Sequence, residues 1–101
     1  MTSTERWEPV DFTFADIVAS PESQARVLIV KGKCKQSAMK LAPVTYAKKP
    51  EYWRIDVLRD ASGDIYLPVT EPYEIKLELA GHLGTKGVEI VGKTRKEKID
   101  I

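Results

Sequence analysis

The stretch that decides the fold is Arg26-Val-Leu-Ile-Val-Lys-Gly-Lys-Cys-Lys35. It contains the longest apolar run in the chain, and most residues of that run are β-branched. Because β-branched side chains lose less rotamer freedom on a pleated sheet than in a helix, the stretch is predicted to be a strand. With a period of two, Leu28, Val30 and Cys34 share one face, and the lysines follow the other. We expect this strand to be the first and central one of a small β domain.

Length and composition indicate a single globular domain. The chain has 101 residues, of which 43% are hydrophobic and 31% are charged, as is typical of a globular domain. The single cysteine, Cys34, excludes an internal disulfide and a zinc site made of cysteines alone. The N-terminus lacks the pattern of a secretion signal, and no apolar run reaches the roughly 18 residues that a membrane span requires. We therefore expect a cytoplasmic protein that does not contact a membrane.

Charge is distributed unevenly along the chain. Residues 1–25 carry five acids and one arginine, a net charge of −4, whereas residues 26–49 carry seven basic residues and no acid, a net charge of +7. A local field of this kind can attract an anionic partner although the formal net charge of the chain is only +1. The alternative is that the lysines are solvated, since lysines on strands also discourage edge-to-edge pairing. We divide the chain into an acidic N-terminal arm, 1–25, and a single β domain, 26–101.

The arm is predicted to contain one short helix. Thr13 followed by Asp16 resembles a capping box, which indicates a helix from Phe14 to Ala19. The spacing of Phe12 and Phe14 also allows a short strand. After the central strand, extended segments are expected over 40–46 and 52–58, and a turn at 60–64 leads to a return strand over 65–69.

Residues 70–84 carry two conflicting signals. Thr70 with Pro72 in the first turn is a helix start, and Gly81 is a helix stop. The apolar residues from Tyr73 to Leu79, however, alternate strictly with charged ones, which is a strand pattern. We favour a short helix near 71–80, because Glu, Lys, Leu and Ala are strong helix formers. Two further strands are expected over 88–91 and 98–101.

The order of these elements resembles an OB-fold barrel, whose helix lies between the third and fourth strands. The segment Ala80-Gly-His-Leu-Gly-Thr-Lys-Gly-Val-Glu-Ile-Val-Gly92 resembles the helix exit and fourth strand of small bacterial OB-like domains, and Val30-Lys-Gly-Lys-Cys34 resembles their first strand. An extra residue at Gly87 and the absence of a secretion signal depart from that pattern. The resemblance implies a small barrel of five to six strands over 26–101, and it carries over no binding or catalytic residue. The alternative is a β-sandwich in which 73–80 forms a strand.

The sequence indicates no catalytic or metal site. His82 is the only histidine, and nothing in the spacing brings it to Cys34, the only thiol. Cys34 is expected to be a small core residue. Asp60 and Asp64 flank a glycine turn, where hydrogen bonds to the backbone explain them. We therefore expect a protein that is not an enzyme and needs no cofactor.

Basic and aromatic residues of the first strands form the one candidate binding site. An OB-fold binds single-stranded nucleic acid through such strands and their loops, with aromatic rings stacking on bases and cations following phosphates. We therefore expect a binding module for single-stranded nucleic acid or another anionic partner, unless the lysines only confer solubility. Trp53 is a further candidate for stacking. The candidate nucleic-acid-binding residues are Lys31, Lys33, Lys35, Tyr46, Lys48, Lys49, Tyr52 and Arg54.

The competing prediction is a protein–protein interaction or structural module. Small β domains dock onto partners through exposed strands or aromatic patches. The acidic arm carries Trp7, Phe12 and Phe14, and these three residues are candidates for docking or self-association.

Overall fold

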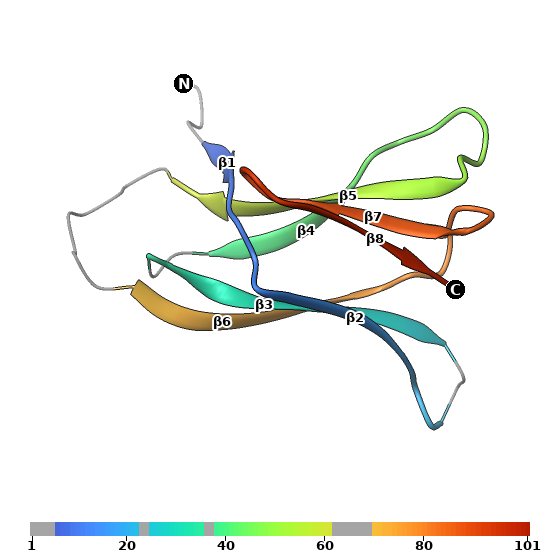
Figure 1. Cartoon of the computed structure of the whole chain (residues 1–101), viewed down its shortest axis with the longest axis horizontal. Coiled ribbons are helices and arrows are strands. Elements are labelled where there is room, and N and C mark those ends of the chain that lie inside the picture. The colour runs from blue at the N-terminus through green and yellow to red at the C-terminus, as the bar shows by residue number, and fades with distance from the viewer. Residues whose placement is uncertain (1–5, 23–24, 36–37, 62–69) are drawn as a thin grey trace, which may run out of the picture.

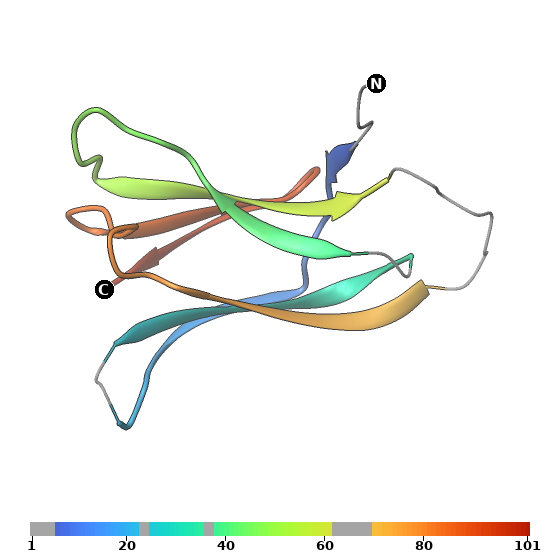
Figure 2. The ribbon, with the colours of Figure 1, turned by 180° about the vertical axis from the view of Figure 1, so that it is seen from behind.

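The computed structural model describes residues 6–22, 25–35, 38–61 and 70–101, and every regular element in these ranges is a strand. Figures 1 and 2 show two sheets stacked face to face. The five-stranded sheet contains β1 (Trp7–Pro9), β4 (Met39–Pro43), β5 (Tyr52–Asp60), β7 (Gly87–Val91) and β8 (Lys96–Asp100), and the three-stranded sheet contains β2 (Phe14–Ala19), β3 (Arg26–Lys35) and β6 (Thr70–Glu78).

β5 is the central strand of the five-stranded sheet. Arg59 of β5 lies opposite Met39 of β4 and also opposite Glu8 of β1, so these two strands pair with opposite edges of β5. Parallel β7 shares the edge used by β1, further towards the start of β5, and β8 pairs with the outer edge of β7. The three-stranded sheet is antiparallel throughout, in the order β2-β3-β6.

The prediction for residues 26–35 is confirmed, because β3 spans the quoted stretch from end to end. Leu28 and Val30 are fully buried and pack against Ile55 and Val57 of the opposite sheet. Burying side chains of this size stabilises the fold by about 1.5 to 3 kcal/mol each. β3 is the central strand of its sheet, but it is the third strand in the chain because two strands precede it.

The predicted helix near 71–80 is wrong, because the segment forms β6 over Thr70–Glu78. Its alternating residues Tyr73, Ile75 and Leu77 face the core, and the charged residues between them face solvent. A helix would turn these side chains to different sides, so that they could not bury one stripe together. The burial gained by the strand outweighs intrinsic helix preferences of a few tenths of a kcal/mol per residue.

The predicted N-terminal helix from Phe14 to Ala19 is also wrong, because these residues form β2. Each of them pairs with a residue of β3, from Phe14 opposite Lys31 to Ala19 opposite Arg26. Ala15 and Ile17 point towards the core. The pattern of the short strand thus overrides the capping signal.

The two sheets do not close into a barrel, so that part of the fold prediction is wrong and the arrangement matches the β-sandwich alternative. β4 lies near β6 and β2 lies near β8 along the two long sides, but the members of each pair belong to different sheets. The strands expected after β3 are confirmed as β4, β5, β7 and β8. The expected return strand over 65–69 lies outside the described residues.

The acidic N-terminal segment contributes a strand to each sheet. β1 pairs with β5, and β2 pairs with β3. Between them Phe12 is only 2% exposed and belongs to the core. The carboxylate of Asp11 accepts hydrogen bonds from Thr94 and from the backbone N–H of Arg95, which fastens the β7–β8 turn to this segment.

Candidate binding site at the β4–β5 loop

The candidate nucleic-acid-binding residues fall on opposite sides of the sandwich. Lys31 and Lys33 alternate with the buried residues of β3, so they lie on the outer face of the three-stranded sheet. Tyr52 and Arg54 alternate with the buried Ile55 and Val57 of β5, so they lie on the outer face of the five-stranded sheet. The eight residues therefore do not form one continuous track on the surface.

Acidic residues accompany the lysines of β3. The ammonium of Lys31 lies 3.9 Å from the carboxylate of Glu74 on β6, and Lys76 lies 3.7 Å from the same carboxylate. Lys33 is exposed and pairs in register with Pro72. The backbone of Lys35 pairs with Thr70, and its side chain lies outside the described part. This face carries mixed charge rather than a positive field.

Tyr52 and Arg54 are held by neighbours on their own sheet. The guanidinium Nε of Arg54 donates to Asp56 Oδ1 at 2.9 Å, and this hydrogen bond raises the pKa of Arg54. The hydroxyl of Tyr52 donates to Asp100 of β8, and this hydrogen bond raises the pKa of Tyr52. The ammonium of Lys98 lies 4.9 Å from the centroid of the Tyr52 ring. One face of that ring is therefore already covered by a cation.

Tyr46, Lys48 and Lys49 lie together in the loop between β4 and β5. The ring of Tyr46 contacts Trp53 edge to face at a centroid distance of 5.2 Å, and its hydroxyl accepts a hydrogen bond from the Arg54 N–H at 3.4 Å. Lys48 and Lys49 are exposed, and neither forms an ion pair with another described residue. The loop thus presents two uncompensated cations beside two aromatic rings.

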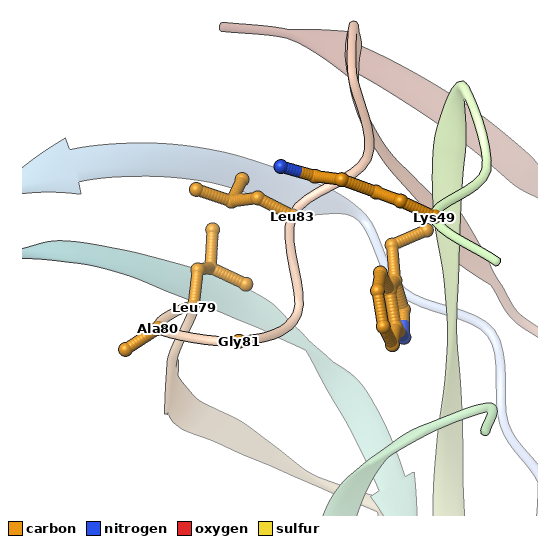
Figure 3. Close-up of a pocket in the computed structure, with 6 residues that line it drawn as sticks. Lys49, Leu79, Ala80, Gly81 and Leu83 are labelled. Carbon is orange, nitrogen blue, oxygen red and sulfur yellow. The ribbon is translucent and has the colours of Figure 1, made fainter. Parts of the chain in front are cut away.

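An open apolar pocket of about 430 Å³ lies beside Lys49, between the β4–β5 loop and the segment that follows β6. Figure 3 shows Leu79, Ala80, Gly81 and Leu83 along that segment, with Lys49 reaching over from the other loop. Trp53 completes the lining, and its indole Nε1–H donates to the carbonyl of Val44 at 2.8 Å. This hydrogen bond fixes the orientation of the ring. Pockets of this size and composition are typical of ligand sites.

The imidazole of His82 contacts the indole of Trp53 edge to face, at a centroid distance of 5.7 Å. Its Nδ1 atom is buried and has no hydrogen-bond partner among the described residues. Cys34 lies near the start of β6, where its thiol contacts the sulfur of Met39 at 3.4 Å, and His82 lies beyond the far end of that strand. Histidine and thiol are therefore separated by the length of β6.

Of the eight predicted site residues, three share the β4–β5 loop, and the sequence does not predict the pocket wall opposite Lys49. Tyr46, Lys48 and Lys49 are neighbours in the sequence, so their grouping needed no tertiary information. Leu79 and Leu83 come from the connection after β6, which was expected to end a helix. The strict alternation of 73–79 was the one signal that could have placed them at this end of the sandwich.

Nothing in the comparisons with known proteins assigns a role to this site. No family model, no curated protein and no solved structure matches the chain. The described residues contain no group of three or more histidine, cysteine or carboxylate side chains that could hold a metal ion. No helix long and apolar enough to cross a membrane occurs among them.

Proposed function

We propose that the protein is a non-enzymatic binding module that takes single-stranded nucleic acid at the β4–β5 loop. The observation that carries this proposal is the apolar pocket lined by Trp53 and Lys49. The exposed Lys48 precedes Lys49 in the same loop, and neither lysine has an ion-pair partner among the described residues. The proposal keeps the cytoplasm as the compartment, since the single cysteine gives the chain no internal disulfide.

A nucleotide combines the two chemical features that this end of the sandwich matches. Its base is flat and largely apolar on its faces, and its phosphate is anionic. The base suits the lining of Trp53, Leu79 and Leu83. The phosphate suits ammonium groups, which act as point charges without a demand for geometry. Stacking of a base on an aromatic ring is worth about 1 to 3 kcal/mol, so one well-seated base with two phosphates gives measurable affinity.

The loop is a better candidate than the lysines of β3 because its charge is not offset. On β3, Lys31 has Glu74 at 3.9 Å, and β6 places further acids beside it. On β5, Arg54 is already engaged by Asp56. Opposite charges at such distances weaken the potential that a phosphate experiences. The contact surface that we propose is therefore centred on Tyr46, Lys48, Lys49 and Trp53.

A pair of matched variants tests this assignment. Fluorescence anisotropy with a labelled single-stranded DNA of mixed sequence is measured over a range of salt concentrations. We expect binding that weakens with salt, and we expect Lys48→Glu with Lys49→Glu to reduce the salt slope by about 1.4 units, since each phosphate contact on a single strand contributes about 0.7. The control, Lys33→Glu with Lys35→Glu, changes the net charge equally on β3 and should keep most of the slope.

Three outcomes decide between the possibilities. Loss of binding in the loop variant alone supports the proposal. Loss in the β3 variant alone moves the contact to the three-stranded sheet. No binding by the unmodified protein at low salt overturns the nucleic-acid assignment. Quenching of Trp53 fluorescence in a Trp7→Phe background provides an independent test of whether a base enters the pocket.

A protein–protein interaction module is the second candidate function. The exposed apolar side chains of Phe14 and Val18 on β2 favour it. Of the other residues expected to dock, Phe12 is buried in the core, and Trp7 is half-buried beneath the ammonium of Lys40 at 4.1 Å.

A further inference from the structure

A second open pocket lies on the outer face of the five-stranded sheet, where two strands share one edge of β5. Its volume is about 420 Å³. The pairs of β1 end at Pro9 opposite Leu58, and those of β7 end at Val91 opposite Asp56. The edge of β5 therefore passes from one partner to the other between Asp56 and Leu58. The residues that line this outer pocket are Pro9, Arg54, Asp56, Leu58, Val91, Gly92, Lys93 and Lys96.

The β1–β2 connection holds the walls of the outer pocket in place. The N–H of Val10 donates to the carbonyl of Val57 at 3.0 Å, and the chain then turns into the core. Gly92 begins the β7–β8 turn against this connection, since a Cβ atom there would lie 2.9 Å from the carbonyl oxygen of Val10. Figures 1 and 2 show that turn beside the end of β1. A site with fixed walls loses little entropy when a ligand binds.

Cations outnumber acids in the lining. The carboxylate of Asp56 is engaged by Nε of Arg54 at 2.9 Å, whereas the terminal nitrogens of Arg54 have no hydrogen bond to another described residue. Lys93 and Lys96 are exposed, and neither forms an ion pair within the described part of the chain. Three cations and one carboxylate give the lining a net charge of +2.

The neighbouring rows of the sheet do not cancel this charge. On one side Glu89 lies in register between Arg54 and Lys98, so that row carries a net charge of +1. On the other side Lys40 is the register partner of Leu58 and adds a further positive charge. The potential over the outer pocket is therefore positive, and it favours an anionic ligand.

We propose that the outer pocket binds the phosphate group of a small phosphate monoester. A monoester carries close to two negative charges at neutral pH, which matches the net charge of the lining. The planar guanidinium of Arg54 suits the geometry of phosphate oxygens, and the two lysines add point charges. The apolar side chains of Leu58 and Val91 suit a small apolar group attached to the phosphate. Carboxylates and phosphodiesters carry a single charge, so they should bind less tightly.

This inference is independent of the proposed nucleic-acid site. The two pockets share no lining residue. Trp53 packs against the core, whereas the next residue, Arg54, points to the outer face, because side chains of a strand alternate. Binding of a small monoester is tested without nucleic acid, and its failure would leave the assignment of the β4–β5 loop in place.

A titration with phenyl phosphate, followed by NMR, tests the site. Backbone amide shifts of the isotope-labelled full chain are recorded at neutral pH and constant ionic strength. We expect saturable changes centred on the amides of Gly92, Lys93 and Lys96. Methyl phenyl phosphate, a diester with the same ring and one charge, should bind at least about tenfold more weakly, because it loses a charge-assisted hydrogen bond.

Matched variants separate the lysines of the outer pocket from the general charge of the chain. Lys93→Gln with Lys96→Gln should weaken the binding of phenyl phosphate by at least about tenfold. The control, Lys31→Gln with Lys33→Gln, removes the same charge from the other sheet. It should change the affinity by less than about twofold, since salt screens distant exposed charges. The amide spectra also report whether each variant is folded.

Four results would overturn the proposal. The first is a titration that does not saturate, and the second is equal weakening by the two pairs of variants. The third is equal affinity for the monoester and the diester, because the match of two charges would then play no part. The fourth is displacement of phenyl phosphate from these amides by single-stranded DNA without a terminal phosphate, which would make the outer pocket part of a nucleic-acid surface.

Discussion

The phenol ring of Tyr73 on β6 occupies the space directly over Gly32 on β3. The two residues are register partners, and a Cβ atom at position 32 would lie 2.6 Å from the hydroxyl oxygen of Tyr73 and 2.8 and 2.9 Å from two carbons of its ring. The hydroxyl of Tyr73 donates to the carbonyl of Asp11 at 2.8 Å. Glycine at position 32 therefore leaves room for the side chain of Tyr73 on the neighbouring strand. The contact joins β3, β6 and the β1–β2 connection.

The Gly32–Tyr73 contact predicts a coupled pair of substitutions. Gly32→Ala should lower the free energy of unfolding by about 1 to 3 kcal/mol, because the added methyl group displaces a packed ring. In a Tyr73→Val background the same change should cost less than about 1 kcal/mol, since the clash is gone. Urea unfolding of the four proteins provides the measurement. Equal costs in both backgrounds would show that the ring is not the cause.

Tyr73 also predicts a loss of stability at high pH. Burial raises its pKa from the ordinary value of 10.0 to about 12. Because the folded state holds the proton more tightly, the contribution is complete below pH 10 and disappears as the pH rises through 12. The difference in unfolding free energy between the unmodified protein and Tyr73→Phe should therefore shrink as the pH rises from about 9 to about 12. A difference that is independent of pH would contradict this assignment.

The hydrogen bonds to the Asp11 carboxylate predict a loss of stability at low pH. Hydrogen bonds from the side chain and backbone of Thr94 lower the pKa of the Asp11 carboxyl below its ordinary value of 3.8. Stability from this group is therefore present above pH 3.8 and is lost as the pH falls through the lower folded value. Thr94→Val should raise the pKa of Asp11 and lower the urea midpoint at neutral pH. Carboxyl chemical shifts would report the pKa, and an unchanged titration would contradict the prediction.

His82 predicts a substitution that does not destabilise. Its Nδ1 atom is buried without a partner among the described residues. Replacing an unsatisfied buried polar atom by carbon is neutral or favourable. His82→Phe should therefore change the free energy of unfolding by less than about 1 kcal/mol, while keeping an edge-to-face contact with Trp53. A loss above about 2 kcal/mol in urea unfolding would indicate that the imidazole makes a hydrogen bond after all.

Local pattern was sufficient to predict β3 and insufficient to predict β6. The apolar run of β3 decides its conformation without reference to distant residues. For 70–78 the local preference favoured a helix, and the strand wins only because Val27 and its neighbours on β3 provide a register for it. That pairing joins segments far apart in the chain, so propensity alone does not contain it.

The candidate site, too, is predictable from the sequence only where its residues are neighbours in the chain. Tyr46, Lys48 and Lys49 lie within four consecutive residues, so they stay close together whatever the fold. The resemblance to a barrel predicts that the lysines of β3 lie beside them, whereas two stacked sheets direct the outer face of β3 away from the outer face of β5. Which strands share a surface depends on how the sheets are stacked, and a single sequence carries that information only weakly.

The parallel pairing of β5 with β7 has a consequence for synthesis of the chain. β1 precedes β5 in the chain and pairs with it, whereas the adjoining part of the same β5 edge is completed only by β7, which is made after β5 and β6. The five-stranded sheet therefore stays incomplete until β7 and β8 have been translated. Strands that are distant in the sequence lose the entropy of closing a long loop before they gain the energy of their pairing, and this slows folding. Until then the partly made protein exposes the unpaired part of the β5 edge, and unpaired strand edges make a nascent chain prone to aggregation.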